Sequence, residues 1–191
     1  MIYSYDIAIE PGVTLSEVET AIGKLGGVFA QEIPATDKQL FERIWRLPDD
    51  AVVRYVYDRY VDVATIRAET PHLAQPARIV ESVSAVLPLT DRIELNNRAR
   101  GKDPTDRRFA IRAYAALANE YDADLVSALN EALTDQDAGV RDDAIRAIRR
   151  WPHFVFAARL DKVAATEPDP DRAHVMTELA ENVRLHGRRG L

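Results

Sequence analysis

The sequence predicts an α+β protein in two parts: an N-terminal, mostly antiparallel sheet with packed helices, and a short all-α array of helical hairpins. Three observations lead to this. Residues 2–68 contain several short segments with the alternation or the β-branched and aromatic content of strands, amphipathic helical patterns accompany them, and the residues after 103 repeat at a fixed interval. A polar segment that ends in glycine and proline separates the parts, so we assign residues 1–95 to a sheet domain and residues 96–191 to a helical domain.

The first predicted element is a strand over residues 2–10, in which the odd positions are apolar. A proline–glycine pair ends it. The sequence TLSE at residues 14–17 has the capping-box pattern, in which a threonine hydroxyl and a glutamate carboxylate satisfy free amide groups of a first helical turn. Apolar residues then recur at helical spacing as far as the glycine pair at 26–27, so we expect a helix that covers one face of a sheet.

Further strands and a second helix follow in the first domain. The predicted strands are residues 28–33, 40–47, 52–57 and 60–68, with proline or aspartate in the turns between them. Pro76 begins a helix whose apolar stripe ends before Pro88. The order of these elements predicts an antiparallel meander.

The tyrosines of the third and fourth of these strand segments have different expected roles. Tyr55 and Tyr57 alternate with Val53 on one side of a strand, which favours a place in the core. Tyr60 lies outside that alternation, and we predict it as a candidate partner-binding residue.

The second domain repeats itself. Superposition of residues 103–113 on residues 137–147 gives six identities in eleven positions, and a weaker third copy places Leu179 where Ile145 stands. A repeat with the spacing from residue 103 to residue 137 is typical of helical hairpins that bury their apolar faces only against neighbouring copies. We therefore expect Ala110 and Ala144 to occupy matching buried places in adjacent hairpins.

The segment LNEALTDQDAGVRDDAIRAI resembles the HEAT-repeat family, in particular its short bacterial, PBS-lyase-type form, through a leucine-rich helix, an acidic turn, Val-Arg and an Ala-Ile-x-Ala core. The resemblance covers residues 103–186. It implies a scaffold that binds partners along a curved surface. Relatives of that family also include chromophore-attachment proteins and a group of DNA glycosylases.

Composition excludes several classes of protein. The chain has 191 residues, a formal net charge of −6 and no cysteine, which removes disulfides, thiolate metal sites and cysteine nucleophiles. The longest stretch without a charged residue is 82–90, far shorter than a membrane-spanning helix, and the N-terminus lacks the pattern of a secretory signal. We therefore expect a cytoplasmic protein without a membrane partner.

The residue types that carry chemistry occur without catalytic spacing. The four histidines lack the pairing of a metal-binding helix, the serines lack a nucleophile elbow, and no glycine-rich loop precedes a lysine. Acidic residues crowd the helix starts, where they favour capping. We therefore expect no enzyme, no metal and no cofactor.

Arginines dominate the basic residues of the helical domain. Arg107 and Arg141 occupy equivalent repeat positions, and we predict a structural ladder in which they pair with Asp103, Asp135 or Asp137.

A second group of arginines lies off the apolar stripe and is expected to face solvent. These residues, with a neighbouring tryptophan, form the candidate partner-binding patch, because arginine and tryptophan are enriched at binding hot spots. The patch consists of Arg112, Arg146, Arg149, Arg150 and Trp151.

The sequence favours a non-catalytic protein-protein interaction module. Residues 1–90 carry thirteen acidic and eight basic side chains, which suggests a partner with a basic surface, and an immunity or regulatory protein is one such case. The alternative is a nucleic-acid-binding or base-excision protein that uses the arginines of the helical domain. A helper for tetrapyrrole attachment rests on the family resemblance alone.

Overall fold

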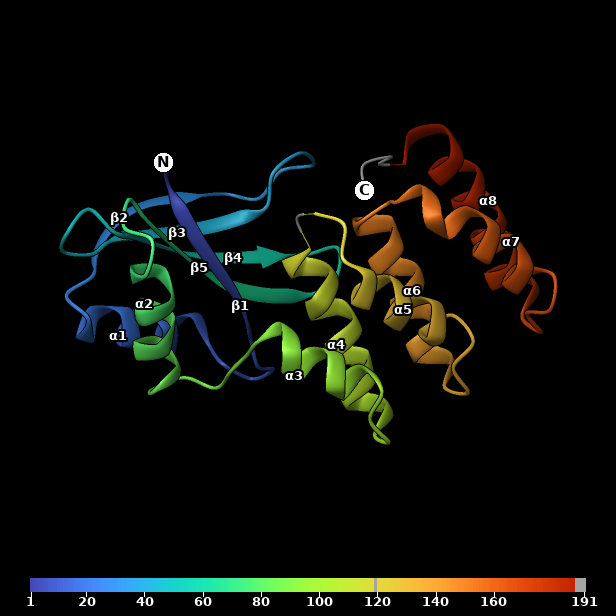
Figure 1. Cartoon of the computed structure of the whole chain (residues 1–191), viewed down its shortest axis with the longest axis horizontal. Helices are drawn as coiled ribbons and strands as arrows, with labels where there is room; N and C mark the ends of the chain where they lie inside the picture. The colour runs from blue at the N-terminus through green and yellow to red at the C-terminus, as the bar shows by residue number, and fades with distance from the viewer. Residues whose placement is uncertain (119, 188–191) are drawn as a thin grey trace. The chain divides into compact units, whose positions relative to one another are not determined.

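The computed structural model describes residues 1–118 and 120–187 (Figure 1). The described residues form an α+β structure with one six-stranded antiparallel sheet, as the sequence predicts. The chain divides into two compact units, Met1–Arg92 and Ile93–Leu191, whereas composition placed the boundary after residue 95. No helix in the described part of the chain combines the length and the apolar content needed to cross a membrane.

The sheet of the first unit is a meander with one inserted strand. Its strands are β1 (Tyr3–Ile9), β2 (Val28–Ile33), β3 (Phe41–Arg46), β4 (Val52–Asp58), β5 (Val63–Thr70) and β6 (Leu89–Thr90). Their order across the sheet is β2-β3-β4-β5-β1-β6. The consecutive strands β2 to β5 pair as antiparallel neighbours, and β1 lies between β5 and the short β6.

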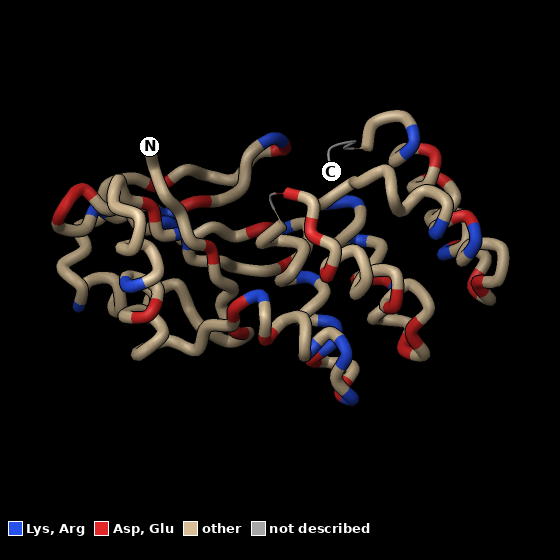
Figure 2. The backbone as a smooth tube through the Cα atoms, in the orientation of Figure 1, with Lys and Arg blue, Asp and Glu red and all other residues tan. Residues whose placement is uncertain are grey.

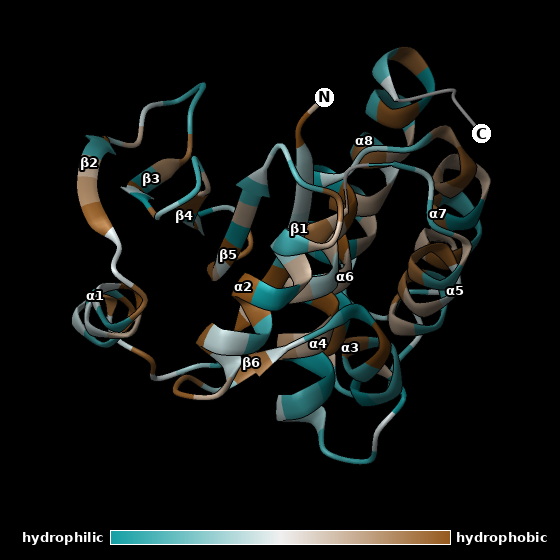
Figure 3. Ribbon diagram, turned by 60° about the vertical axis from the view of Figure 1, so that its left-hand side comes forward, coloured by the Kyte–Doolittle hydropathy of each residue, from teal (hydrophilic) through white to brown (hydrophobic). Residues whose placement is uncertain are grey.

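Two helices, α1 (Leu15–Lys24) and α2 (Gln75–Ser84), contribute to a single core with one face of this sheet (Figure 3). Val18 and Ile22 of α1 and Val83 of α2 are fully buried in it, and Tyr55 packs at its margin, as the alternation predicts. Tyr57, predicted beside it, is only partly buried, and its hydroxyl donates to Asp62. The predicted capping box at the start of α1 is present.

Two elements of the first unit differ from the prediction. The strand expected over residues 60–68 begins only at Val63, because Asp62 adopts a positive φ of 53° and the Asp58 carboxylate accepts a hydrogen bond from the Tyr60 amide, which closes a turn. The two-residue strand β6 is too short to produce an alternating pattern in the sequence.

The second unit is helical throughout its described elements. These are α3 (Arg92–Ala99, which begins at the last residue of the first unit), α4 (Pro104–Leu117), α5 (Ala123–Ala132), α6 (Ala138–Arg150), the 3-10 turn η1 (Phe154–Phe156), α7 (Ala157–Ala164) and α8 (Pro170–His186). Helix α3 extends over the first residues, 96–99, of the polar segment 96–104 at which the sequence places the boundary, and its Leu95 is fully buried. Glu94 in the first turn and Arg98 in the last turn of α3 match the helix dipole.

The repeat predicted from the sequence is visible in the helices. The starts of α4 and α6 are separated by the same interval as the starts of α5 and α7, and this interval is the one that relates the repeated sequence segments. Ala110 of α4 and Ala144 of α6 are both fully buried. The first two copies of the hairpin therefore follow the sequence repeat.

The third copy has a different register from the predicted one. An aspartate caps the start of each of the helices α4, α6 and α8, at Asp103, Asp137 and Asp169. The interval from Asp137 to Asp169 is two residues shorter than the interval from Asp103 to Asp137. Leu179 therefore does not stand in the place of Ile145. The prediction treated the interval as constant, whereas the turn before α8 is shortened.

Candidate functional site

Three arginines from two packed helices meet one carboxylate in the second unit. Arg108 of α4 donates from Nε to Oδ2 of Asp143 on α6 over 2.9 Å, and Arg146 donates from Nη1 to Oδ1 over 3.4 Å. Nε of Arg112 lies 3.7 Å from Oδ2 of the same aspartate. We call these four residues the Asp143 cluster. These four side chains alone sum to +2, and Asp137 and Asp142 also act electrostatically on Arg108.

Burial within the Asp143 cluster is uneven. The side chain of Asp143 is 1% exposed, whereas those of Arg108 and Arg146 are 45% and 53% exposed. The hydrogen bond that Arg108 donates to Asp143 raises the pKa of Arg108, which is therefore charged at every physiological pH. Asp143 is therefore a buried counter-ion, and the side chains of Arg108 and Arg146 present positive charge to solvent.

Gly139 makes room for the guanidinium of Arg108. A Cβ atom added at Gly139 would lie 2.9 Å from both Cζ and Nε of Arg108, closer than real Cβ contacts. The absence of a side chain at this position thus allows Arg108 to lie against the first turn of α6 and reach Asp143.

The Asp143 cluster departs from the repeat that surrounds it. The superposition of Asp103 on Asp137 also places Asp143 on Phe109, which is a buried apolar residue, and Asp142 on Arg108. One copy therefore carries a buried carboxylate where its equivalent carries an aromatic ring.

The predicted patch is only partly brought together. Arg112 and Arg146 belong to the Asp143 cluster, Arg149 is exposed farther along α6, and Arg150 is half-buried. Figure 2 shows basic and acidic residues interspersed along the helices of this unit. Binding by these arginines stays a prediction.

Trp151 is wrongly predicted as a surface residue. It is 1% exposed, stacks on His153 with ring centroids 5.3 Å apart and meets the ring of Phe156 edge-on. The reason is its place at the C-cap of α6, where the chain leaves the helix and its side chain is enclosed by the residues that follow. Trp151 thus belongs to the core of the second unit.

Tyr60 lies in the first unit and is half-exposed, with 51% of its surface accessible. Its hydroxyl donates to the carbonyl oxygen of Asp37 over 3.0 Å, and the guanidinium of Arg59 lies 5.2 Å from its ring centroid. These contacts hold the β4–β5 turn against the loop after β2. A binding role for Tyr60 stays a prediction.

The predicted arginine ladder is present between the hairpins. Arg107 forms two parallel hydrogen bonds with Asp135, from Nε to Oδ2 over 2.8 Å and from Nη2 to Oδ1 over 2.9 Å. Arg141 donates to the carbonyl oxygen of Asp135 but takes Glu167 as its carboxylate partner, at 3.2 Å, which the sequence did not predict. Burial acts to raise the pKa of Asp135, but the hydrogen bonds from Arg107 and from the Asp137 amide outweigh it, and the pKa is lowered.

Sequence reasoning missed Arg108, which the structure makes a central member of the Asp143 cluster. Arg108 follows Arg107 directly and precedes a buried phenylalanine, so its own neighbours mark it only as an exposed helical residue. The signal that was available is the repeat itself, since Asp143 replaces an apolar residue at a buried position.

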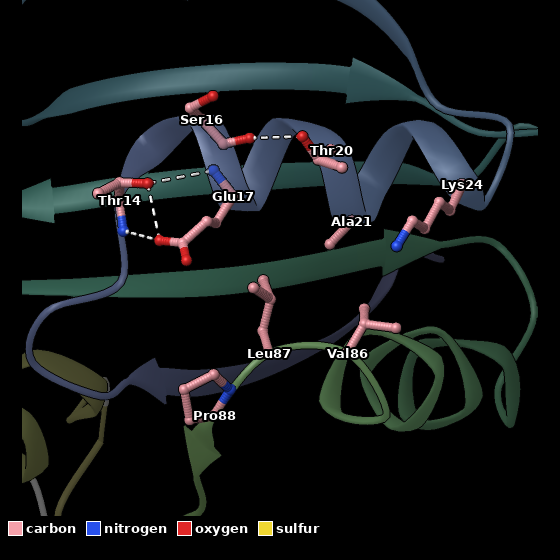
Figure 4. A pocket seen from close by; sticks show the side chains of 9 residues that line it. All are labelled: Thr14, Ser16, Glu17, Thr20, Ala21, Lys24, Val86, Leu87 and Pro88. Carbon is pink, nitrogen blue, oxygen red and sulfur yellow. Dashed lines mark hydrogen bonds between the residues drawn. The ribbon is translucent and has the colours of Figure 1, made fainter.

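A shallow pocket of about 280 Å³ lies in the first unit between α1 and the residues after α2 (Figure 4). Three of its polar side chains are engaged by the helix itself: Thr20 donates to the carbonyl oxygen of Ser16, and Thr14 and Glu17 form the capping box. The hydrogen bonds from the Thr14 amide and hydroxyl lower the pKa of Glu17. These groups serve the start and first turns of α1.

Comparison with known proteins finds no matching family, no matching curated protein and no matching solved structure. The HEAT-repeat resemblance therefore stays a prediction. Within residues 1–118 and 120–187, no three histidine, aspartate or glutamate side chains are grouped as a metal site.

Proposed function

We propose that the protein is a non-catalytic binding module that recognises an anionic segment of a partner protein through the Asp143 cluster. The observation that carries the proposal is the convergence of three arginines on one buried carboxylate, with two of the arginine side chains about half exposed. Arginine is enriched at binding hot spots, and charge complementarity sets both partner choice and association rate.

The excess of acidic side chains in the first unit is weaker support for a partner with a basic surface than the Asp143 cluster is for an anionic partner. Several carboxylates of the sheet already have arginine partners: Asp6 pairs with Arg67, and Glu42 and Glu69 both pair with Arg54. A carboxylate that already has an ion-pair partner offers less to an incoming cation. An immunity-type role for the sheet stays a prediction.

Anisotropy of a fluorescein-labelled oligoglutamate peptide tests the proposal. We expect the wild-type protein to bind it and the double variant Arg108→Gln with Arg146→Gln to bind at least about tenfold more weakly, because two arginine contacts are lost. The matched control is Lys24→Gln with Arg78→Gln, which removes the same charge from exposed positions on α1 and α2. An equal loss in both variants would reduce the effect to net charge and contradict the proposal.

Nucleic acid is the second candidate ligand, favoured by the exposure of Arg146 and Arg149 on one helix. Against it, residues 91–191 carry seventeen basic and eighteen acidic side chains, so the helical half has no positive field. A gel shift with duplex DNA at low salt decides between the two. A DNA band whose retardation weakens steeply with salt and disappears with the double variant would favour nucleic acid over a protein segment as the ligand.

A further inference from the structure

The two edges of the sheet in the first unit are protected to different degrees. At one edge, β6 has only two residues, too few to pair with another strand over any length. At the other edge, β2 has six residues, Val28–Ile33, and no strand of the described residues pairs with its outer side (Figure 3). An edge strand of this length presents backbone N–H and C=O groups to which a further strand can bind.

The side chains of β2 do little to prevent such pairing. Its first five residues, 28–32, are all exposed, and Val28 and Phe29 keep 69% and 52% of their surface accessible. Proline and lysine, which commonly block a sheet edge, are absent from the strand, and its one charged residue, Glu32, is bound by Arg43 over 2.7 Å. We infer that β2 pairs in antiparallel fashion with β2 of a second copy of this chain.

The faces on which the side chains of β2 lie determine the register of that pairing. Phe29 lies opposite the core residue Trp45 of β3, and Glu32 lies on the same face. Val28 and Ile33 lie on the other face, because the register of β2 on β3 shifts after Phe29. A two-fold axis through the sheet keeps each face on its own side. The register that uses the whole strand therefore sets Val28 against Ile33 of the second copy, and Phe29 against Glu32.

This register is chemically complementary. Val28 of each copy meets Ile33 of the other, so the symmetry forms an apolar pair twice. Glu32 meets an aromatic ring rather than a second carboxylate, and Arg43 already neutralises it within its own chain. Both outer edges of β2 are used in the pairing, so the assembly closes as a dimer. This surface belongs to the first unit, and the inference does not depend on the Asp143 cluster.

Sedimentation equilibrium of the full chain over a range of concentrations tests the inference. We expect the wild-type protein to dimerise reversibly, and Val28→Lys to raise the dimer dissociation constant at least about tenfold, because a charge replaces an apolar contact in each half of the pair. The matched control is Leu73→Lys, which adds the same charge at an apolar residue that is 73% exposed and lies outside the strands of the same unit. It is expected to leave the dissociation constant unchanged.

Disulfide trapping tests the register, and the lack of cysteine in the natural chain makes it specific. In the double variant Val28→Cys with Ile33→Cys, each new thiol faces its counterpart on the second copy, so mild oxidation is expected to give a covalent dimer. Within one chain the two thiols are separated by the length of the strand, roughly 16 Å, which no disulfide spans. The same separation holds between copies in Val28→Cys alone, which is expected to run as a monomer on a non-reducing gel.

Each remaining outcome contradicts the inference, provided that circular dichroism shows every variant to be folded. A chain that stays monomeric at every concentration leaves β2 free for a strand of another protein and overturns the pairing of two copies. A dimer that Val28→Lys does not weaken, or that Leu73→Lys weakens equally, places the contact elsewhere. Cross-linking of Val28→Cys alone as efficient as that of the double variant would overturn the antiparallel register.

Discussion

The two units arrange the same ionic groups in opposite ways. In the sheet, Arg54 lies between two carboxylates, with Nη1 3.1 Å from Glu42 and Nε 2.9 Å from Glu69. In the helical unit, Asp143 lies among three arginines. Counted over these side chains alone, the first arrangement sums to −1 and the second to +2, so the local excess of charge is negative around Arg54 and positive around Asp143.

A third arrangement lies between these extremes. Arg107 and Asp135 form a one-to-one pair with two parallel hydrogen bonds, and the carbonyl oxygens of Gly101 and Lys102 accept further hydrogen bonds from the same guanidinium. This pair is neutral, and most donors of its guanidinium are used within the chain. It is the structural counterpart against which the Asp143 cluster is compared.

The two tryptophans allow the units to be followed separately. Trp45 belongs to the core of the first unit and Trp151 to that of the second, and both are almost completely buried. Replacement of one by phenylalanine leaves the fluorescence of the other as a reporter of its own unit. Urea unfolding in these two backgrounds measures each of the effects below, and separate transitions are fitted separately because two units need not unfold in one step.

The largest effect is expected from Asp143→Asn in the Trp45→Phe background. The amide nitrogen of asparagine is a donor facing other donors, and three arginines lose their shared counter-ion. Loss of one partner from a buried ionic group leads us to expect a decrease of about 3 kcal/mol in the free energy of unfolding of the second unit. A decrease below about 0.5 kcal/mol would show that the cluster is not held by Asp143.

Arg107→Gln is expected to have the next largest effect, about 2 kcal/mol at pH 7 in the same background, since it breaks a bidentate charged pair. The pKa of Asp135 is lowered in the folded state. The stability that this provides is therefore present above the unfolded pKa, near 3.9, and is lost as the pH falls through the folded pKa below it. The difference in unfolding free energy between wild type and variant should accordingly shrink below about pH 4. A difference that stays constant with pH would contradict a role for the Asp135 carboxylate in this pair.

Much of the architecture follows from local patterns in the sequence. The capping box at Thr14 and Glu17 and the repeat that relates α4 to α6 are encoded by recognisable sequence motifs, and both are confirmed. The Asp143 cluster is different, because two of its arginines come from α4, a separate helix much earlier in the chain. In the sequence, an aspartate near the start of a helix is explained by its favourable interaction with the helix dipole. Only the packing of α4 against α6 shows that Asp143 is buried.

The burial of Trp151 was unpredictable for a related reason. It follows two arginines at the end of α6, so the helical pattern places it beside exposed residues. Its burial depends on where the chain turns after the helix and on the rings of His153 and Phe156. Helical periodicity ends at the cap and contains no information about that turn.

The smallest effect tests the comparison between the units most directly. Arg54→Gln in the Trp151→Phe background removes the guanidinium that binds both Glu42 on β3 and Glu69 on β5, so the two like charges, on either side of β4, are less well neutralised. We expect the free energy of unfolding of the first unit to decrease by about 1 kcal/mol.

The matched control is Arg146→Gln in the Trp45→Phe background. It removes an arginine that has two arginine neighbours, so the lost contact with Asp143 is offset by reduced repulsion, and the change should lie within about 0.5 kcal/mol. Added salt should reduce the loss of unfolding free energy caused by Arg54→Gln, because ions screen charges that are partly accessible to solvent, as Glu42 and Glu69 are. A loss at Arg146 as large as that at Arg54 would mean that the cluster, like the sheet, has no excess of positive charge to offer a ligand.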